Sequence, residues 1–232
     1  MVITIDGPAG AGKSTVARKL AQRLGFDYLD TGAMYRAATW KLLQADPDDC
    51  SAEEVARIVA ETDIRFSGEG PDRRIMCDGR DVSGEIRTPR VTGNIYRVAD
   101  EPAARKPLIE AQREIAGRRN LVTEGRDQGT DVFPDAAVKF YLTASRRERA
   151  MRRLQDLQDA GHDVSLEEMV EQLARRDHED NSRPVGALRK EDDMEVVDST
   201  GLTVNETVDR MIETIDRECP DAISKSERRA RK

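Results

Sequence analysis

Hydrophobic residues along this chain follow two spacings: short continuous runs, and longer stretches in which an apolar residue recurs every three or four positions. The run Val2–Ile5 is β-branched and is typical of a buried strand. Residues 15–24 follow at helical spacing, and Gly25 is the expected helix stop. Further strands are predicted at residues 26–29, 121–123, 138–142 and 195–197, and a helical pattern follows each of them except 121–123, after which residues 124–130 come. Five such units predict an α/β fold with a five-stranded parallel sheet flanked by helices.

Start and stop signals place the other helices. Thr31 is the expected N-cap of a helix over residues 33–45. Ser51 with Glu54 is a helix N-terminal signature, and that helix should run to about residue 62. The remaining helices are expected from Thr88-Pro89 up to Pro102, over 103–117, over 145–161 with Gly161 at its end, from Ser165 to about Arg183, and over 203–219.

The pattern changes between residues 63 and 102. Three short alternating runs occur there, and turn residues separate them. Asp78-Gly79 between two of these runs is a strong hairpin signal. The runs are Asp63–Ser67, Arg74–Cys77 and Arg80–Val82. We therefore expect a small antiparallel sheet inserted into the βα chain.

Composition excludes several classes of protein. The 232 residues carry a net charge of −7, which argues against general nucleic-acid binding because that needs a basic face. No run of 18 apolar residues is present, and the chain opens on a strand rather than a secretory leader, so we expect a cytoplasmic protein without a membrane span. The scattered Cys50, Cys77 and Cys219 lack the usual zinc spacing. No long apolar seam favours a dimer, so we expect a monomer.

The first strand and helix enclose the sequence GPAGAGKST, which fits the phosphate-binding pattern G-x-x-x-x-G-K-[ST]. Its glycines let backbone N–H groups turn toward an anion, and the helix N-terminus adds partial positive charge. Lys13 is expected to reach the β- and γ-phosphates of a nucleotide, and the Ser14 hydroxyl to ligate Mg²⁺. The predicted nucleotide-binding residues are Gly7, Pro8, Ala9, Gly10, Ala11, Gly12, Lys13, Ser14 and Thr15.

Such a loop with five βα units is typical of small kinases and of GTPases. The sequence has no N-K-x-D or T-K-x-D guanine motif, which favours a kinase. Arginine clamps phosphates with two donors, and several arginines recur in suggestive places. These are Arg36 one turn into the second helix beside Tyr35, Arg126 after a buried strand, the helical cluster Arg149, Arg152 and Arg153, and Arg176 and Arg183 around Asp177 and Asp180. Alone, the helical cluster would be a salt-bridged solvated helix; beside this loop it indicates phosphoryl transfer.

Six segments occur in a telling order: GPAGAGKST, LDTGAMYRA, DVSGEIRT, LVTEGRDQGTDVFPDA, RRD-x-x-D-x-x-R and VVDST. Together they resemble the bacterial cytidylate kinase family from residue 1 to about 217. The resemblance implies a nucleoside-monophosphate-kinase fold that transfers the γ-phosphoryl group of ATP to CMP or dCMP with Mg²⁺. It also implies one kinase domain over residues 1–220, with its core at about 1–62, 118–148 and 194–219, a nucleotide-monophosphate-binding insertion at about 63–102, a helical lid at about 149–183 and a disordered basic tail at 221–232.

The resemblance also implies roles for single residues. Arg36, Arg126 and Arg183 match family residues that hold the acceptor phosphate, and Thr31, Arg176 and Asp180 match those at the sugar. Arg105 and Asp127 match the residues that read the base. Arg149, Arg152 and Arg153 match the start of the lid that closes over ATP. The expected mechanism is in-line transfer, in which Lys13 and the lid arginines stabilise the moving group. No general base is needed, because the attacking CMP oxygen is already anionic.

The chemistry of cytosine agrees with this assignment. Asp127 can accept a hydrogen bond from the C4 amino group, and Arg105 can donate to N3. Uracil inverts both groups, which costs about 1–3 kcal/mol for each unpaired partner. Tyr96 stands where the family usually has a small polar residue, so tolerance for UMP stays open. Other P-loop kinases, of the uridylate/cytidylate or shikimate type, and a nucleotide-binding regulator without transfer activity are the alternatives.

Overall fold

The computed structural model describes residues 1–45, 50–68, 73–117, 119–159 and 164–220. The chain divides into two compact units. The first comprises Met1–Leu29, Ala116–Arg183 and Ala187–Lys232, and the second comprises Asp30–Ile115 with Pro184–Gly186. The basic tail and the Gly161 helix stop, both expected from the sequence, lie outside the described residues. Within the described ranges, no helix has the length and apolar character needed to cross a membrane.

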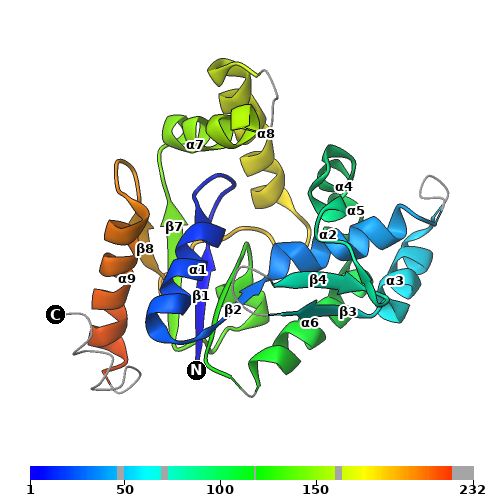
Figure 1. The fold of residues 1–232 in the computed structure, drawn as a ribbon, viewed down its shortest axis with the longest axis horizontal. Helices are drawn as coiled ribbons and strands as arrows, with labels where there is room; N and C mark the ends of the chain where they lie inside the picture. The colour runs from blue at the N-terminus through cyan, green and yellow to red at the C-terminus, as the bar shows by residue number, and fades with distance from the viewer. Residues whose placement is uncertain (46–49, 69–72, 118, 160–163, 221–232) are drawn as a thin grey trace. The chain divides into compact units, whose positions relative to one another are not determined.

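A five-stranded sheet forms the centre of the first unit (Figure 1), as predicted. Its strands are β1 (Val2–Asp6), β2 (Asp27–Asp30), β6 (Leu121–Gly125), β7 (Val138–Thr143) and β8 (Glu195–Asp198), in the order β2-β6-β1-β7-β8. The central strand β1 pairs in parallel with β6 and β7, which places Asp6 beside Gly125 and Tyr141. Parallel strands end at one edge of the sheet, so the loops after β1 and β6 meet there.

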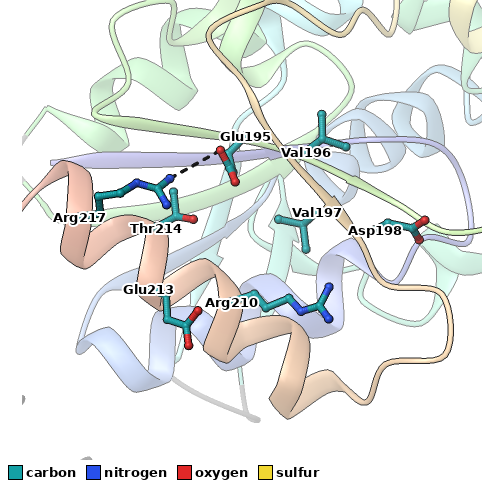
Figure 2. A pocket seen from close by; sticks show the side chains of 8 residues that line it. All are labelled: Glu195, Val196, Val197, Asp198, Arg210, Glu213, Thr214 and Arg217. Atoms are coloured by element: carbon teal, nitrogen blue, oxygen red, sulfur yellow. Dashed lines mark ion pairs between the residues drawn. The ribbon is translucent and has the colours of Figure 1, made fainter.

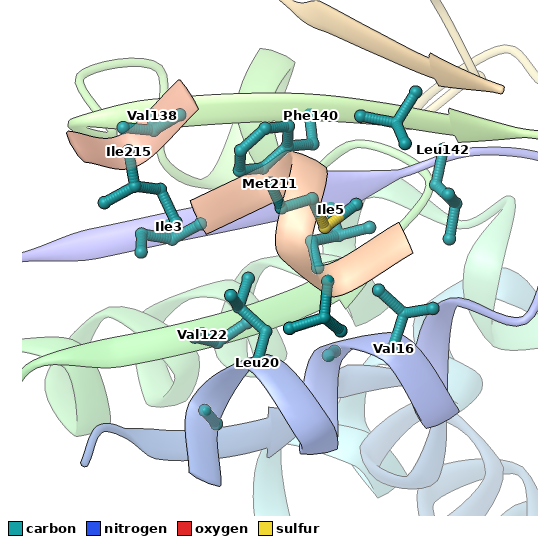
Figure 3. Packing of buried hydrophobic residues seen from close by; sticks show 14 of the residues in the cluster. Ile3, Ile5, Val16, Leu20, Val122, Val138, Phe140, Leu142, Met211 and Ile215 are labelled. Carbon is teal, nitrogen blue, oxygen red and sulfur yellow. The ribbon is translucent and has the colours of Figure 1, made fainter. Parts of the chain in front are cut away.

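Helices α1 (Lys13–Leu24) and α9 (Val204–Glu218) pack against this sheet (Figure 1). Figure 3 shows why: Ile3 and Ile5 on β1, Leu20 on α1 and Met211 on α9 meet in one buried apolar cluster. The β-branched run predicted as a buried strand therefore lies at the base of the core, and its Ile3 and Ile5 are fully buried. Burying an aliphatic side chain contributes about 1.5–3 kcal/mol, so this cluster holds β1, and the loop that follows it, in place.

The other helices of the first unit are α7 (Arg146–Asp159) and α8 (Leu166–Ser182). Met169 and Leu173 of α8 pack with Ala150 of α7 in a small apolar cluster. A short π-turn over Gln128–Val132 follows β6. This pairing of α7 and α8 is the region that the sequence analysis expects to act as a lid; how the lid moves stays a prediction.

The second unit combines helices with the predicted antiparallel sheet. It holds α2 (Thr31–Leu42), α3 (Ala52–Glu61), β3 (Ile64–Ser67), β4 (Arg74–Cys77), β5 (Arg80–Asp81), a 3₁₀ turn at Glu85–Arg87, α4 (Pro89–Gly93), α5 (Tyr96–Ala99) and α6 (Pro102–Ala116), whose last residue belongs to the first unit. The hairpin between β4 and β5 turns at Asp78 (φ 49°) and Gly79 (φ 78°). Two successive positive φ angles define the tight turn that the Asp-Gly pair predicts.

Helix boundaries match most of the sequence signals. Reciprocal capping boxes join Ser51 with Glu54 at α3, Ser165 with Glu168 at α8, and Thr203 with Glu206 at α9. Gly25 ends α1 with a left-handed φ of 67°. These are the signals that depend on adjacent residues alone, and all of them are confirmed.

Two local predictions are wrong. The N-cap of α2 is Asp30, whose carboxylate accepts a hydrogen bond from the Ala33 amide at 2.8 Å, and Thr31 is the first helical residue. Both side chains have capping chemistry, and in the structure the earlier one is the cap. The single helix expected between Thr88 and Pro102 is two short helices, because the chain leaves the helix at Asn94 (φ −109°), whose side chain donates to the Arg90 carbonyl.

Candidate active site

The predicted phosphate-binding loop connects β1 to α1. Gly7 lies so close to β7 that a Cβ there would fall 2.0 Å from the Leu142 carbonyl oxygen, so only glycine fits. Gly10 and Gly12 adopt φ angles of 76° and 86°, which other residues rarely adopt. Because Gly12 is the N-cap of α1 and has no side chain, the first amides of that helix meet no side-chain cap. The loop has the form of an anion nest at a helix N-terminus.

Lys13 lies inside this loop rather than extending into solvent. Its Nζ donates to the carbonyls of Gly7 at 2.8 Å and Pro8 at 2.9 Å, and the side chain is buried. Burial and, to a lesser extent, the nearby Arg126 guanidinium lower the pKa of Lys13, Glu124 acts in the opposite direction, and the net result is a pKa of about 7. An incoming polyphosphate would supply the negative charge that this ammonium group lacks.

Ser14, the predicted metal ligand, faces a carboxylate that the sequence analysis did not assign. Its Oγ donates to Oε1 of Glu124, the fourth residue of β6, at 2.7 Å. The Tyr28 hydroxyl approaches the same oxygen at 3.4 Å. Glu124 itself is buried. The one sequence signal for it is an acidic residue within an otherwise apolar strand end, and that signal does not identify a partner 110 positions away.

A second cluster gathers two predicted arginines around one predicted carboxylate. Arg126 donates from Nε to Oδ2 of Asp180 at 2.6 Å, and Arg183 reaches Oδ1 of the same residue at 3.0 Å. Asp180 is only 1% exposed. Its burial alone would raise the pKa of the carboxyl group, but the two guanidinium groups outweigh burial and hold that pKa below its usual value. The structure thus brings together Arg126, which follows β6, Asp180 of α8, and Arg183, which follows α8.

The predicted lid arginines divide into two kinds. Arg149 is buried, forms a two-donor ion pair with Asp177 at 2.9 and 2.7 Å, and donates to the Ala9 carbonyl of the phosphate-binding loop. Arg152 donates to the Ala11 carbonyl of that loop and to Ser199. Both side chains therefore contact the loop itself. Arg153 is exposed and Arg176 is partly exposed.

Asp127, the predicted base-reading residue of the first unit, is buried at the start of the π-turn. The backbone around it is fixed by an unpredicted residue, Asp6, whose carboxylate accepts from the amides of Gln128 at 2.9 Å and Gly129 at 2.7 Å. Burial raises the pKa of Asp6 to about 7, and the two amides and Lys13 moderate that rise.

In the second unit, the predicted residues at the start of α2 are close neighbours. Arg36 approaches the Asp30 carboxylate at 3.4 Å, and a Cβ on Gly32 would lie 3.1 Å from the Arg36 guanidinium. The Nε of Arg36 is buried and finds no hydrogen-bond partner among the described residues. Thr31 and Tyr35 are buried beside it on the same helix.

Arg105, the predicted base-reading residue of the second unit, is 5% exposed. Its guanidinium donates to the Ala99 carbonyl at 3.0 Å and lies 5.3 Å from the centre of the Tyr35 ring. Gly186, with φ 61°, packs so closely that a Cβ there would lie 2.3 Å from Nη2 of Arg105. Tyr96, by contrast, is 54% exposed.

A separate groove lies between β8 and α9 and shares no residue with the predicted site (Figure 2). Its lining is charged along the rim, with an ion pair of 3.7 Å between Arg217 and Glu195. None of the residues that line this groove is a predicted site residue. We therefore take the edge of the sheet at which the phosphate-binding loop lies as the candidate active site.

The five-stranded parallel sheet, the phosphate-binding loop with its buried lysine, and the arginines at the same sheet edge define the class of protein as a P-loop kinase. A solved structure of an uncharacterized protein from Eubacterium ventriosum has the same fold, with a TM-score of 0.52 at 12% identity over 93% of this chain and 98% of that one.

Sequence comparison then places the chain in a family. The family model described as cytidylate kinase matches residues 3–217, so the chain belongs to the cytidylate kinase family. A cytidylate kinase of Rhodopirellula baltica is 46% identical over 96% of this chain and 95% of its own length. One of Carboxydothermus hydrogenoformans is 46% identical over 94% and 98%. The chain is therefore an ATP-dependent nucleoside monophosphate kinase, as the resemblance in the sequence indicates.

Proposed function

We propose that this enzyme transfers the γ-phosphoryl group of ATP to CMP or dCMP with the residues that the sequence analysis selected. The observation that carries the proposal is the position of Lys13, whose ammonium group donates to two carbonyls of the phosphate-binding loop, while the next residue, Ser14, donates to Glu124 of β6. The loop residues 7–15 bind the polyphosphate of ATP through backbone amides and the helix N-terminus. The donor half of the reaction is therefore assigned to the first unit.

Mg²⁺ fits the donor set beside Lys13. Ser14 and Glu124 offer a hydroxyl and a carboxylate oxygen that lie 2.7 Å apart, and hard oxygen ligands are those that Mg²⁺ prefers. Mg²⁺ in kinases needs only one or two protein ligands, because phosphates and water complete its shell. Ser14 would hold the ion directly and Glu124 would hold it or its water. Bound there, the ion would neutralise charge on the phosphates of ATP.

The acceptor phosphate of CMP is assigned to Arg126 and Arg183, with Arg36 from the second unit. Asp180 orients the first two guanidinium groups, and Arg126 Nη1 also donates to the Gly125 carbonyl at 3.2 Å, so both arginines are held in place at the end of the sheet. The Nε of Arg36, which is buried and has no hydrogen-bond partner in the described part of the chain, supports the same role, because a buried donor without a partner costs about 1–3 kcal/mol until a ligand satisfies it. Thr31, Arg176 and Asp180 are proposed to lie at the sugar, with Tyr35 alongside.

The base is assigned to Asp127 and Arg105. Each is buried within its own unit, and burial raises the energetic penalty for a base that leaves either side chain unpaired. Cytosine satisfies both, whereas uracil satisfies neither. Selectivity for cytosine over uracil follows from these two side chains.

The transfer itself needs positioning and positive charge rather than a general base. The acceptor oxygen is an anion already, so the protein's task is to align it with the γ-phosphorus and to stabilise the charge that spreads over the moving group. Lys13, Arg126 and Arg183 supply that charge, together with Arg149 and Arg153 of the proposed lid. Arg152 and Arg149 also hold the carbonyls of the phosphate-binding loop, which keeps its amides directed at the anion.

The wider arrangement remains part of the proposal. We assign one kinase domain to residues 1–220, with the insertion, lid and tail boundaries given above. We propose that the enzyme works as a cytoplasmic monomer without nucleic-acid or membrane partners. In support, the large exposed apolar residues among those described come from four separate elements: Tyr96, Met151, Val196 and Val204.

The test is an assay of ADP release with ATP and Mg²⁺, in which CMP, dCMP, UMP, AMP and shikimate are offered in parallel. Turnover of CMP and dCMP well above UMP supports the base assignment. Equal turnover of UMP would assign a looser base pocket, as Tyr96 allows. Turnover of shikimate alone, or of none of the acceptors despite ATP binding, would contradict the proposal and favour the other kinase or the regulator.

A further inference from the structure

Asp6 links two loops that do different work. It is the last residue of β1 and directly precedes Gly7 of the phosphate-binding loop. Its two carboxylate oxygens accept one hydrogen bond each, from the amides of Gln128 and Gly129. The side chain is completely buried, so no water competes for these oxygens. Burying a carboxylate costs free energy unless it is hydrogen-bonded or paired, and here both oxygens accept hydrogen bonds from one turn of the backbone.

The turn that Asp6 holds begins at the proposed base-reading residue. The Asp127 carbonyl accepts from the amides of Asp131 and Val132, at 2.9 and 3.1 Å, so these hydrogen bonds tie Asp127 to the π-turn Gln128–Val132 that follows it. A second anchor joins this turn to β6, because the Thr123 hydroxyl donates to Oε1 of Gln128 at 2.9 Å. Gly129 has no room for a side chain, since a Cβ there would lie 2.9 Å from Oγ1 of Thr4.

We propose that Asp6 is a positioning residue for substrate selection: it fixes the turn that carries Asp127, and thereby sets the base-reading carboxylate against the phosphate-binding loop. Asp6 touches neither substrate. It acts through the amides of Gln128 and Gly129, and its effect is therefore on the nucleoside monophosphate rather than on ATP. This inference rests on the proposed base-reading role of Asp127.

The electrostatic setting agrees with such a role. The charged and titratable groups that face Asp6 are Lys13 from the start of α1, Asp127 and Arg126 from the loop after β6, and Tyr141 from β7. The carboxylates of Asp6 and Asp127 repel each other, and the hydrogen bonds from the amides of Gln128 and Gly129 offset this repulsion. The hydrogen bonds from the two amides therefore join the Asp6 carboxylate and the π-turn in one fixed arrangement.

The decisive variant is Asp6→Asn. It keeps the size of the side chain but replaces one acceptor oxygen by an NH₂ group, which faces a backbone N–H with another donor. We expect the KM for CMP to rise about tenfold or more. The KM for ATP should stay within about twofold, and the preference for CMP over UMP should fall. Val122→Ala is the matched control: it removes packing from the same sheet without touching the turn, so it should lower stability and leave both KM values unchanged.

A second measurement does not depend on whether the variant folds. In the unliganded wild-type protein, hydrogen exchange should show the Gln128 and Gly129 amides to be protected, because each is bonded to a buried carboxylate. Rapid exchange of both amides would overturn the proposal. An Asp6→Asn protein that folds and keeps the wild-type KM for CMP, or that raises the KM for ATP equally, would overturn it as well.

Asp127→Asn in the same assay separates this inference from the proposed function. If Asp127→Asn leaves the base preference unchanged, the base assignment itself fails. If Asp127→Asn changes the preference and Asp6→Asn does not, only the positioning role fails.

Discussion

The phosphate-binding loop of the first unit and the acceptor residues of the second unit handle charge in opposite ways. At the loop, the cations already have partners: Lys13 donates to two carbonyls, and Arg149 of α7, which contacts the loop, is paired with Asp177. At the start of α2, the buried Nε of Arg36 finds no partner among the described residues. In our proposal, the first region binds with backbone groups that any nucleoside triphosphate can use, whereas the second binds with side chains. On this account, general phosphate binding depends on backbone amides, whereas selection of the acceptor depends on side chains.

Replacing Lys13 with methionine should have the largest effect on activity, because it removes the cation of the phosphate-binding loop. Because a cation at the transferring phosphoryl group is worth several kcal/mol in the transition state, we expect Lys13→Met to lower kcat/KM by about 10³-fold. Steady-state kinetics with saturating Mg²⁺ and ATP would measure it. Lys19→Met, on the same helix but outside the loop, is the control and should retain wild-type activity. Activity within tenfold of wild type in Lys13→Met would refute the role assigned to this lysine.

Arg36→Met removes the cation proposed for the acceptor phosphate in the second unit. We expect kcat/KM for CMP to fall about 100-fold, since a charge-assisted bond to an anion contributes about 1.5–3 kcal/mol. The KM for ATP should stay near its wild-type value. Arg57→Met, which breaks only an exposed ion pair with Glu61 in the same unit, should change neither constant. Equal losses for both substrates would show that Arg36 supports the fold rather than the acceptor.

Asp180→Asn leaves Arg126 and Arg183 without their shared carboxylate. Breaking a buried ion pair by removing one partner typically costs about 3 kcal/mol, and we expect a loss of that order in the free energy of unfolding. The pKa of Asp180 lies below its usual value of 3.8, so its contribution is present above about pH 4 and is lost as the pH falls through the lowered pKa. Denaturant unfolding at pH 7 and pH 3 measures both. A variant as stable as wild type at pH 7 would contradict the pairing.

Lys13 also predicts a pH dependence of stability. Its pKa is lowered to about 7 from 10.5, so between these values the unfolded chain binds more protons than the folded protein, and stability attributable to Lys13 rises with pH. Asp6, with its pKa raised from 3.8 to about 7, has the opposite effect between those two values: its contribution falls as the pH rises. Lys13→Met should abolish the rise above pH 7 and keep the fall below it. Unfolding curves from pH 5 to pH 10 would show the difference, and unchanged curves would exclude the burial of this lysine.

Much of the fold is predictable because its signals are local. The β-branched run of β1, the Asp78-Gly79 turn and the capping box at Ser51 each depend on residues within a few positions, and each is confirmed. The boundary at Thr31 is not predictable in the same way, because the adjacent Asp30 has the same capping chemistry and a local pattern does not decide between them.

The site divides along the same line. The phosphate-binding loop carries its own pattern, and the structure gives it the geometry that the pattern predicts. Glu124 and Asp6 escaped notice because their importance comes from partners 110 and 122 residues away. A lone carboxylate at a strand end has no local signature, and only the parallel register that places Asp6 beside Gly125 gives it a function to perform.

The measurement that tests the account most directly is the ratio of kcat/KM for CMP to kcat/KM for UMP in wild type and in Asp127→Asn. The account predicts that the variant lowers this ratio at least about tenfold, mainly through CMP, while the KM for ATP stays unchanged. A ratio that stays the same in Asp127→Asn, or a variant that loses ATP binding along with CMP, would contradict the separation of phosphate binding from base selection.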